Sequence, residues 1–258
     1  MKNLTWIIQS NVSHEHDKWF MALKKMDSPY RAIKIIPFSE GLDDVQYDTP
    51  YAVVHGTTTL IKNAHKKLWN PGAFFNPDNF RPSLWKEKYG EDFVNHAGFL
   101  CKLKDADVSK IGDYCFIRPD GDLKDFSGSL VSKDGLKKFI DEVNVGGCAF
   151  DENLDVFLAP ELDIVHEWRC FVVNGKVVAA SKYKLRTMLD KKEGAPQEVI
   201  EFANIMAEKW SPEKAFVMDI CETAYDTFKI LELNCFNASG VYLAPIEPII
   251  EAVENIYK

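Results

Sequence analysis

The sequence predicts a mixed α/β (α+β) fold, and three features of the chain support this class. About the first 70 residues alternate between strand-like and helix-like patterns, as expected for a small layered unit. Asn174-Gly175 separates two apolar runs, which is the strongest short-range signal for a hairpin. Two further runs with alternating side chains, 216–221 and 229–236, flank a polar turn and predict a second hairpin near the end of the chain.

The N-terminal part predicts strands joined by helices. Ser13 is a candidate N-cap for a helix that carries Trp19, Phe20, Leu23 and Met26 on one side. A second helical pattern follows the third strand and runs through Leu60 and Leu68. The expected strands of this part are 4–9, 32–37 and 51–55.

A segment rich in turn formers and aromatic residues, 70–98, separates this part from the rest. We therefore expect an N-terminal α/β domain over 1–96 and a larger domain over 97–258. The larger domain is expected to contain a strand at 114–119, a helix at 133–143, a strand at 156–160, the hairpin 164–183, and helices at 196–210 and 247–257.

Composition limits the possible functions. The formal net charge is −8, which argues against an extended nucleic-acid surface but leaves room for a local phosphate pocket. The six cysteines are scattered without a C-x-x-C pair, and most lie in apolar runs where a cysteine acts as a small hydrophobe, so we expect a protein of the reducing cytoplasm. No apolar run reaches the length of a membrane span, and the N-terminus lacks the pattern of a signal peptide.

The last hairpin carries oxygen donors at regular spacing. Glu232 and Asn234 are two residues apart on a strand, so their side chains share a face. If the turn centres on Tyr225 and Asp226, Asp219 lies opposite Glu232. Two carboxylates and a carboxamide suit a hard cation such as Mg²⁺. The alternative is a half-exposed hairpin whose polar residues face water.

Three basic residues are candidates for binding an anion, two of them at a strand end or in a loop and one within a strand. Arg118 closes a strand before Pro119, and Lys124 lies in a loop that ends in Ser127-Gly128-Ser129, whose backbone N–H groups can approach an anion. Arg169 lies within an apolar strand, on the same face as Glu167. Such an arginine either binds a ligand or forms an internal salt bridge, whereas Arg118 and Lys124 taken singly are also compatible with plain solvent exposure.

The order of these features resembles the ATP-grasp superfamily. The run from Glu167 to Ala180 resembles the strand pair of its glutamate-ligase and glutathione-synthetase branch. Arg118-Pro, Lys124-Asp-Phe-Ser-Gly and Glu167-Trp-Arg are closer still to a clade of phage and bacterial genomes named for two arginines and a lysine. The resemblance covers roughly 97–258. It implies two α+β subdomains that grip ATP, over 97–160 and 161–258, preceded by a small α/β domain.

The resemblance also implies roles for individual residues. Asp219, Glu232 and Asn234 match the metal-binding positions and would hold Mg²⁺ against the ATP phosphates. Arg118 stands where most ATP-grasp enzymes have a phosphate-binding lysine, so the charge is kept but its geometry becomes a planar fork. The other implied phosphate contacts are Lys124, Ser127 and Gly128, in a loop, 120–129, that would close over the site.

The remaining implied contacts concern the adenine and the reacting groups. The adenine would lie against a hinge that contains Ala159, Glu161 and Leu162, with Glu161 or Glu167 near the exocyclic amine or the ribose. The transferred phosphate or the acyl substrate would face Arg169, Lys182 and Arg186, and the catalytic residues would be Arg169, Lys124 and Arg186.

The function implied is an ATP-dependent carboxylate–amine ligase that forms an acylphosphate. The expected reaction adds an amino acid or a peptide to a protein or a small molecule, and the sequence does not identify the acyl and amine substrates. Two alternatives stay open: a phosphotransferase with a hydroxyl acceptor, which would use the same ATP site, and a non-catalytic nucleotide-binding module. The six histidines form no metal-ligand pattern, and no Ser/His/Asp or Cys/His arrangement is evident.

Overall fold

The computed structural model describes residues 4–11, 15–35, 51–107, 109, 112–121, 125–145, 150 and 152–258. The predicted N-cap Ser13 and the predicted phosphate-binding Lys124 lie outside the described residues. The chain divides into two compact units, each built from separate stretches of sequence. The first unit comprises Met1–Asn76, His166–Ile220 and Leu233–Lys258, and the second comprises Pro77–Val165 and Cys221–Glu232. The domain boundary predicted near residue 97 stays a prediction.

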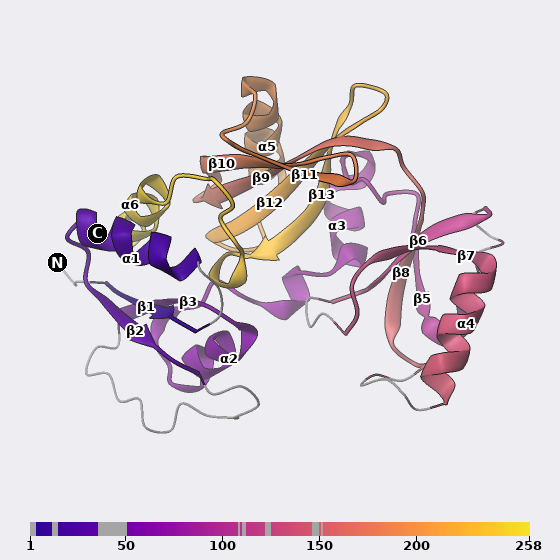
Figure 1. The fold of residues 1–258 in the computed structure, drawn as a ribbon, viewed down its shortest axis with the longest axis horizontal. Helices are drawn as coiled ribbons and strands as arrows, with labels where there is room; N and C mark the ends of the chain where they lie inside the picture. Colours follow the sequence, from indigo (N-terminus) through magenta and orange to yellow (C-terminus); the bar gives the residue numbers. More distant parts are fainter. Residues whose placement is uncertain are drawn as a thin grey trace. The chain divides into compact units, whose positions relative to one another are not determined.

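The first unit contains a parallel four-stranded sheet in the order β2-β1-β3-β4 (Figure 1). The strand interiors are apolar and buried, as is typical of a parallel sheet covered on both faces. The strands are β1 (Thr5–Gln9), β2 (Tyr30–Ile33), β3 (Tyr51–His55) and β4 (Asn70–Gly72), and the helices after β1 and β3 are α1 (Glu15–Lys25) and α2 (Thr58–Lys66).

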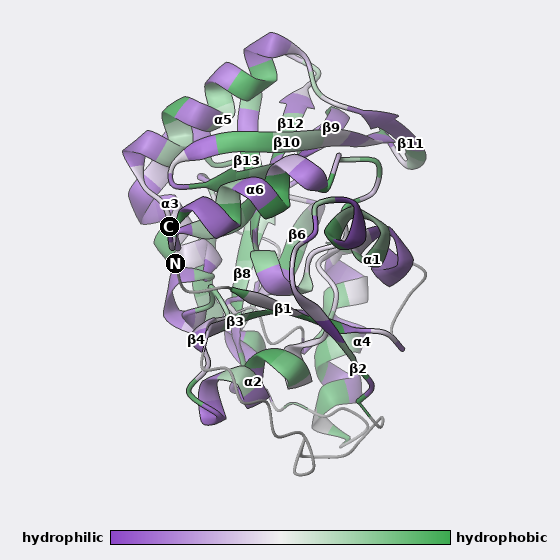
Figure 2. Cartoon of the chain, turned by 90° about the vertical axis from the view of Figure 1, so that its left-hand side faces the viewer, coloured by the Kyte–Doolittle hydropathy of each residue, from purple (hydrophilic) through white to green (hydrophobic). Residues whose placement is uncertain are grey.

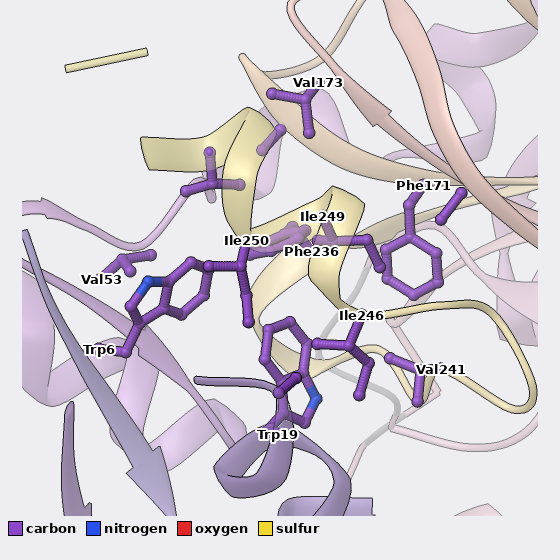
Figure 3. Packing of buried hydrophobic residues seen from close by; sticks show 14 of the residues in the cluster. Trp6, Trp19, Val53, Phe171, Val173, Phe236, Val241, Ile246, Ile249 and Ile250 are labelled. Atoms are coloured by element: carbon purple, nitrogen blue, oxygen red, sulfur yellow. The ribbon is translucent and has the colours of Figure 1, made fainter. Parts of the chain in front are cut away.

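Large aromatic side chains pack among aliphatic ones in the main core of the first unit (Figure 3). The ring centroids of Trp6 and Trp19 lie 5.4 Å apart, and Phe236 packs against both rings at 6.4 Å. The C-terminal helix α6 (Glu247–Asn255) adds Ile249, Ile250 and Val253, which fall on one face at helical spacing. This core joins β1, α1, α6 and the segment after the last strand into one body.

A five-stranded sheet has the order β11-β10-β9-β12-β13. The predicted Asn174-Gly175 hairpin is confirmed, because β9 and β10 pair antiparallel and both turn residues have positive φ, 49° and 74°. The bounds are β9 (Ile164–Val173), β10 (Lys176–Leu185), β11 (Met188–Glu193), β12 (Ala215–Thr223) and β13 (Phe228–Cys235).

Helix α5 (Gln197–Lys209) precedes β12 and is amphipathic. Its buried residues, Val199, Ala203, Met206 and Ala207, recur at helical spacing. Figure 2 shows apolar and polar stretches alternating along α5, as expected for a helix with one covered face. The described part of the chain contains no helix long and apolar enough to cross a bilayer.

The second unit contains an antiparallel sheet in the order β5-β8-β6-β7. Helix α4 (Lys133–Asn144) follows β7 directly, and its N-cap Ser132 accepts a hydrogen bond from the Gly135 N–H at 3.1 Å. The other bounds are α3 (Pro82–Tyr89), β5 (Phe99–Lys102), β6 (Tyr114–Pro119), β7 (Ser129–Ser132) and β8 (Asp155–Pro160).

Candidate functional site

A buried ion pair forms the centre of the candidate site in the first unit. Arg169 of β9 donates from Nε and Nη2 to the two carboxylate oxygens of Asp219 on β12, at 2.9 and 2.7 Å. The Asp219 side chain is only 2% exposed, and Asn234 of β13 donates to it from Nδ2 at 3.2 Å. Burial disfavours the Arg169 cation, but the charge of Asp219 and its hydrogen bonds outweigh burial, so the pKa of Arg169 is raised.

The Arg169 guanidinium lies against the rings of two tyrosines. Its Cζ lies 4.9 Å from the ring centroid of Tyr242 and 5.7 Å from that of Tyr183. The two rings stack on each other at 4.8 Å with an angle of 6° between their planes. Arg169 also donates from Nη1 to the Gly240 carbonyl at 3.1 Å. Cation–π attraction and three directed hydrogen bonds therefore fix this side chain.

The 239–243 loop, which follows β13 and carries Gly240 and Tyr242, is itself held by side chains from distant elements. Lys18 donates to the Tyr242 carbonyl at 2.7 Å, and Glu15 accepts from the Val241 N–H at 3.2 Å. His55 Nε2 lies 3.2 Å from the Ser239 carbonyl, so this nitrogen is the donor. Burial lowers the pKa of His55 to about 4, so the ring is neutral at pH 7.

Glu167 is buried next to this cluster and takes part in one ion pair and one hydrogen bond. Lys184 Nζ lies 2.9 Å from its Oε1, and the Tyr183 hydroxyl hydrogen-bonds to the same carboxylate. Burial, followed by the charges of Asp219 and Glu167, raises the pKa of Tyr183 well above its ordinary value. Tyr183 therefore stays protonated and connects Glu167 to the Arg169 cluster.

The second unit holds another arginine–carboxylate pair. Arg118 of β6 donates from Nη2 to Glu232 Oε1 at 2.9 Å, and its Cζ lies 5.2 Å from the Trp85 ring centroid. The two charged side chains are 13% and 31% exposed, so water reaches this pair. Glu232 lies on β13 two residues before Asn234, as the strand pattern required.

The predicted phosphate loop is described only in part. Gly128 precedes β7, and a Cβ there would lie 2.6 Å from the Phe116 ring, so any other residue would displace that ring. The Ser129 hydroxyl donates to the Ser127 carbonyl at 3.0 Å. Lys124 lies outside the described residues, and its predicted role stays a prediction.

The other predicted residues lie on β8 and at the β10–β11 edge. Ala159 is on β8 opposite Phe116, and Glu161 and Leu162 follow that strand. Lys182 of β10 pairs with Asp190 of β11 at 2.7 Å, and this bond is the main cause of the lowered pKa of Asp190. Arg186 occupies the turn between β10 and β11 with a φ of +51°.

The structure thus brings together Arg169, Asp219 and Asn234 in one cluster and Arg118 with Glu232 in another. Lys182 contributes to an ion pair with a different strand. Sequence reasoning missed Tyr183, Tyr242 and the Gly240 carbonyl. Tyr183 approaches Arg169 through the register of β10 against β9, and the other two approach it through the path of the 239–243 loop. Gly240, six residues after Asn234, was the one available hint of a close backbone contact.

The donor chemistry of the predicted metal ligands fits Mg²⁺. Asp219 and Glu232 offer carboxylate oxygens, and Asn234 donates from Nδ2, which leaves its Oδ1 for a cation. Among the residues that the structure describes, no three His, Cys, Asp or Glu side chains gather as a ready-made metal cluster.

A comparison with protein-family models identifies the family of the chain. The model of the ATP-grasp domain, R2K clade family 3, matches residues 53–253, about three quarters of the chain. The chain belongs to this ATP-grasp family. The resemblance drawn from Arg118-Pro, Glu167-Trp-Arg and the last hairpin is thereby confirmed. No curated protein sequence matches the chain.

Solved structures share the fold over nearly the whole ATP-grasp chain. ATP-grasp ligase PsnB, complexed with a minimal precursor, is 11% identical, with 99% of each chain covered and a TM-score of 0.61. The D-alanine–D-alanine ligase of Coxiella burnetii is 14% identical, with 98% and 94% covered and a TM-score of 0.64. D-cycloserine synthetase DcsG is 9% identical, with 99% and 100% covered and a TM-score of 0.63. The predicted ATP-grasp fold is confirmed.

Proposed function

We propose that this ATP-grasp protein is an ATP-dependent ligase that joins a carboxylate to an amine through an acylphosphate. The observation that carries the proposal is the cluster of Arg169, Asp219 and Asn234, in which charged and polar groups of an apolar sheet are buried together. Burying charges is costly, and a hydrophobic replacement of equal volume is often at least as stable. A functional requirement for these groups accounts for their presence.

The reaction needs activation because a carboxylate has no usable leaving group. A carboxylate oxygen attacks the γ-phosphorus of ATP, and the bond to the bridging oxygen breaks to release ADP. The amine then attacks the acyl carbon, loses a proton, and expels inorganic phosphate. Both steps depend on positioning and on neutralising negative charge rather than on a nucleophilic side chain.

We assign the metal and phosphate contacts as the sequence predicts. Asp219, Glu232 and Asn234 hold Mg²⁺, which supplies positive charge at the phosphates when bound. Arg118 binds phosphate in place of the usual lysine. Glu232 is its present partner, and the exposure of that pair leaves it able to exchange partners. The remaining phosphate contacts are Lys124, Ser127 and Gly128.

The remaining residues are assigned to binding the adenosine and the acyl group. Adenine and ribose are bound by Ala159, Glu161, Leu162 and Glu167. Arg169 orients the transferred phosphoryl group or the acyl substrate. Three of its N–H groups are used by Asp219 and Gly240, which leaves one hydrogen on each Nη for a ligand. Lys182 and Arg186 provide further positive charge.

Relatives of the same fold support ATP use and leave the substrates open. PsnB is complexed with a precursor variant, Mg and ADP, and the D-alanine–D-alanine ligase of Bacillus anthracis is complexed with ATP. Their substrates differ from one another, so the acyl and amine groups of this chain are not transferred from them. We expect a cytoplasmic enzyme, where ATP is available and thiols stay reduced.

The decisive experiment measures thermal stabilisation by Mg-ATP. Ligand binding to the folded state raises the melting temperature by mass action. We expect wild type to respond, and Asp219→Asn and Glu232→Gln to lose the response relative to their own ligand-free melting temperatures. Asp226→Asn makes the same charge change in the exposed turn after β12 and should respond like wild type. A wild type that does not respond to Mg-ATP would refute the proposal.

A product assay separates the ligase from its alternatives. A ligase releases phosphate only when a carboxylate and an amine are both present. A phosphotransferase converts ATP with a hydroxyl acceptor and releases no phosphate, and a nucleotide-binding module binds ATP without turnover. Screening carboxylate and amine pairs for phosphate release therefore tests the chemistry and identifies the substrates together.

A further inference from the structure

A groove in the first unit lies outside the ATP-grasp residues described above. It has a volume of about 740 Å³ and runs between α1 and residues 244–247, at the start of α6. Its floor is apolar, and lysines stand around its rim. The apolar lining residues are Met21, Ala22, Ala244, Pro245 and Ile246, and the charged ones are Lys18, Lys24, Lys25 and Glu247. This volume is within the range of binding pockets.

The α1 side of the groove combines an apolar side chain with cations at regular spacing. Lys18, Met21 and Lys25 are three and four residues apart, so they lie on one face of the helix. Met21 is 74% exposed although it adjoins an apolar floor. At 1.5 Å per residue, the two lysines are about 10 Å apart along the helix axis, with Met21 between them.

The charge balance of the groove is opposite to that of the whole chain. Lys18 donates to a neutral carbonyl, that of Tyr242, so its charge is not cancelled. Lys25 pairs with Glu247 at 2.8 Å, but the two side chains are 73% and 35% exposed, so the pair is weak and can exchange partners. Lys24 is exposed. Three lysines against one glutamate leave an excess of two positive charges, on a chain whose net charge is −8.

We propose that this groove binds an acidic helical peptide segment of another protein. An apolar side chain of the peptide packs on Met21 and the floor. Carboxylates one helical turn before and after it meet Lys18 on one side and the neighbouring Lys24 and Lys25 on the other. A small anion would leave the apolar floor uncovered, whereas an apolar side chain gains free energy from the buried area. The charge complementarity supplies orientation and a faster encounter. Lys18 also joins the groove to the 239–243 loop through the Tyr242 carbonyl.

The test uses the whole chain and a defined peptide, without nucleotide. The probe is a capped, fluorescein-labelled helical peptide in which leucine is flanked by glutamate one turn to each side. Fluorescence anisotropy should show saturable binding that weakens as salt is raised. A peptide with lysine for both glutamates, and one with serine for the leucine, should each bind about tenfold more weakly or worse.

Variants of the chain should change the peptide affinity in opposite directions. Lys24→Glu and Met21→Ser should each weaken binding, by about tenfold and about fivefold. Glu247→Gln removes the one repelling charge and releases Lys25, so binding should tighten about threefold. Lys62→Glu makes the same charge reversal on the exposed face of α2 and should leave affinity unchanged. All four positions are exposed or half-exposed, and melting temperatures of the variants check that they fold.

Several outcomes would overturn the proposal. One is that the acidic peptide does not bind, and another is that Lys24→Glu and Lys62→Glu bind the peptide with equal affinity. Vesicles of phosphatidylserine and phosphatidylcholine bind where the peptide does not, which would make the groove a membrane contact. Concentration-dependent dimerisation that Met21→Ser abolishes, without peptide binding, would assign the groove to a second copy. Since no Mg-ATP is present, each of these results leaves the ligase proposal standing.

Discussion

The two arginine–carboxylate pairs differ mainly in how far water reaches their carboxylates, since the two arginines are almost equally exposed. In the first unit, Arg169 and Asp219 are 12% and 2% exposed, share two hydrogen bonds, and are enclosed by Tyr183 and Tyr242. In the second unit, Arg118 and Glu232 are 13% and 31% exposed and share one hydrogen bond. The difference indicates that Arg169 is fixed within the fold, whereas Arg118 can change partner at small cost.

The largest effect should come from breaking the buried pair. Arg169→Met leaves the Asp219 carboxylate buried without its cation, and we expect the free energy of unfolding to fall by about 3 to 5 kcal/mol. Urea denaturation at pH 7 measures this. The double variant Arg169→Met, Asp219→Leu should recover most of the loss, because no buried charge remains. A loss below about 1 kcal/mol in the single variant would mean that the pair is not buried as described.

The next effect is a pH dependence of the free energy of unfolding, which we expect from His55 beside the Arg169 cluster. Burial holds the pKa of His55 at about 4, against 6.5 for an ordinary histidine. As pH falls from 6.5 to 4, the unfolded chain takes up this proton and the folded chain does not. Stability is therefore full above pH 6.5 and falls toward pH 4, by on the order of 2 to 3 kcal/mol from this group.

Urea unfolding across this pH range checks the contribution of His55. The slope of stability against pH should be smaller in His55→Phe, which keeps a ring near Trp19 and removes the titrating group. An unchanged slope in this variant would assign the pH dependence to other groups. The comparison is informative for the site because His55 anchors the Ser239 carbonyl at the start of the 239–243 loop.

A smaller effect should follow from removing one ring of the tyrosine stack. Tyr242→Leu loses the aromatic stacking and the cation–π contact with Arg169, and should cost about 1 to 2 kcal/mol of unfolding free energy. Tyr242→Phe keeps the ring and should stay near wild type. If the two variants are equally destabilised, the hydroxyl rather than the ring face supports Arg169. Guanidinium chloride denaturation of both variants distinguishes these cases.

The smallest effect should come from the exposed pair. Arg118→Met removes one partly solvated hydrogen bond, and we expect a loss of no more than about 1 kcal/mol. A loss as large as that of Arg169→Met would erase the distinction between the two pairs. Isothermal calorimetry with Mg-ATP should instead show that Arg118→Met weakens nucleotide binding, as expected of a phosphate contact.

The sequence predicted the elements whose side chains follow a clear pattern and missed several short strands. β3 and β6 lie where the strand patterns placed them. β4, β5, β7 and β11 were not predicted. In β11, Met-Leu-Asp-Lys-Lys-Glu has no alternation of apolar and polar residues, so its pairing with β10 supplies the order.

Within the candidate site, the strand periodicity of the sequence is enough to predict which residues share a face. The two-residue spacing of Glu232 and Asn234 and that of Glu167 and Arg169 follow from strand geometry alone. Which carboxylate contacts which arginine follows from the three-dimensional fold. Asp219 lies 50 residues from Arg169, and Glu232 lies 114 residues from Arg118. Such contacts depend on how the strands are arranged in space, which no local pattern encodes, because side-chain periodicity specifies a face but not the neighbour that covers it.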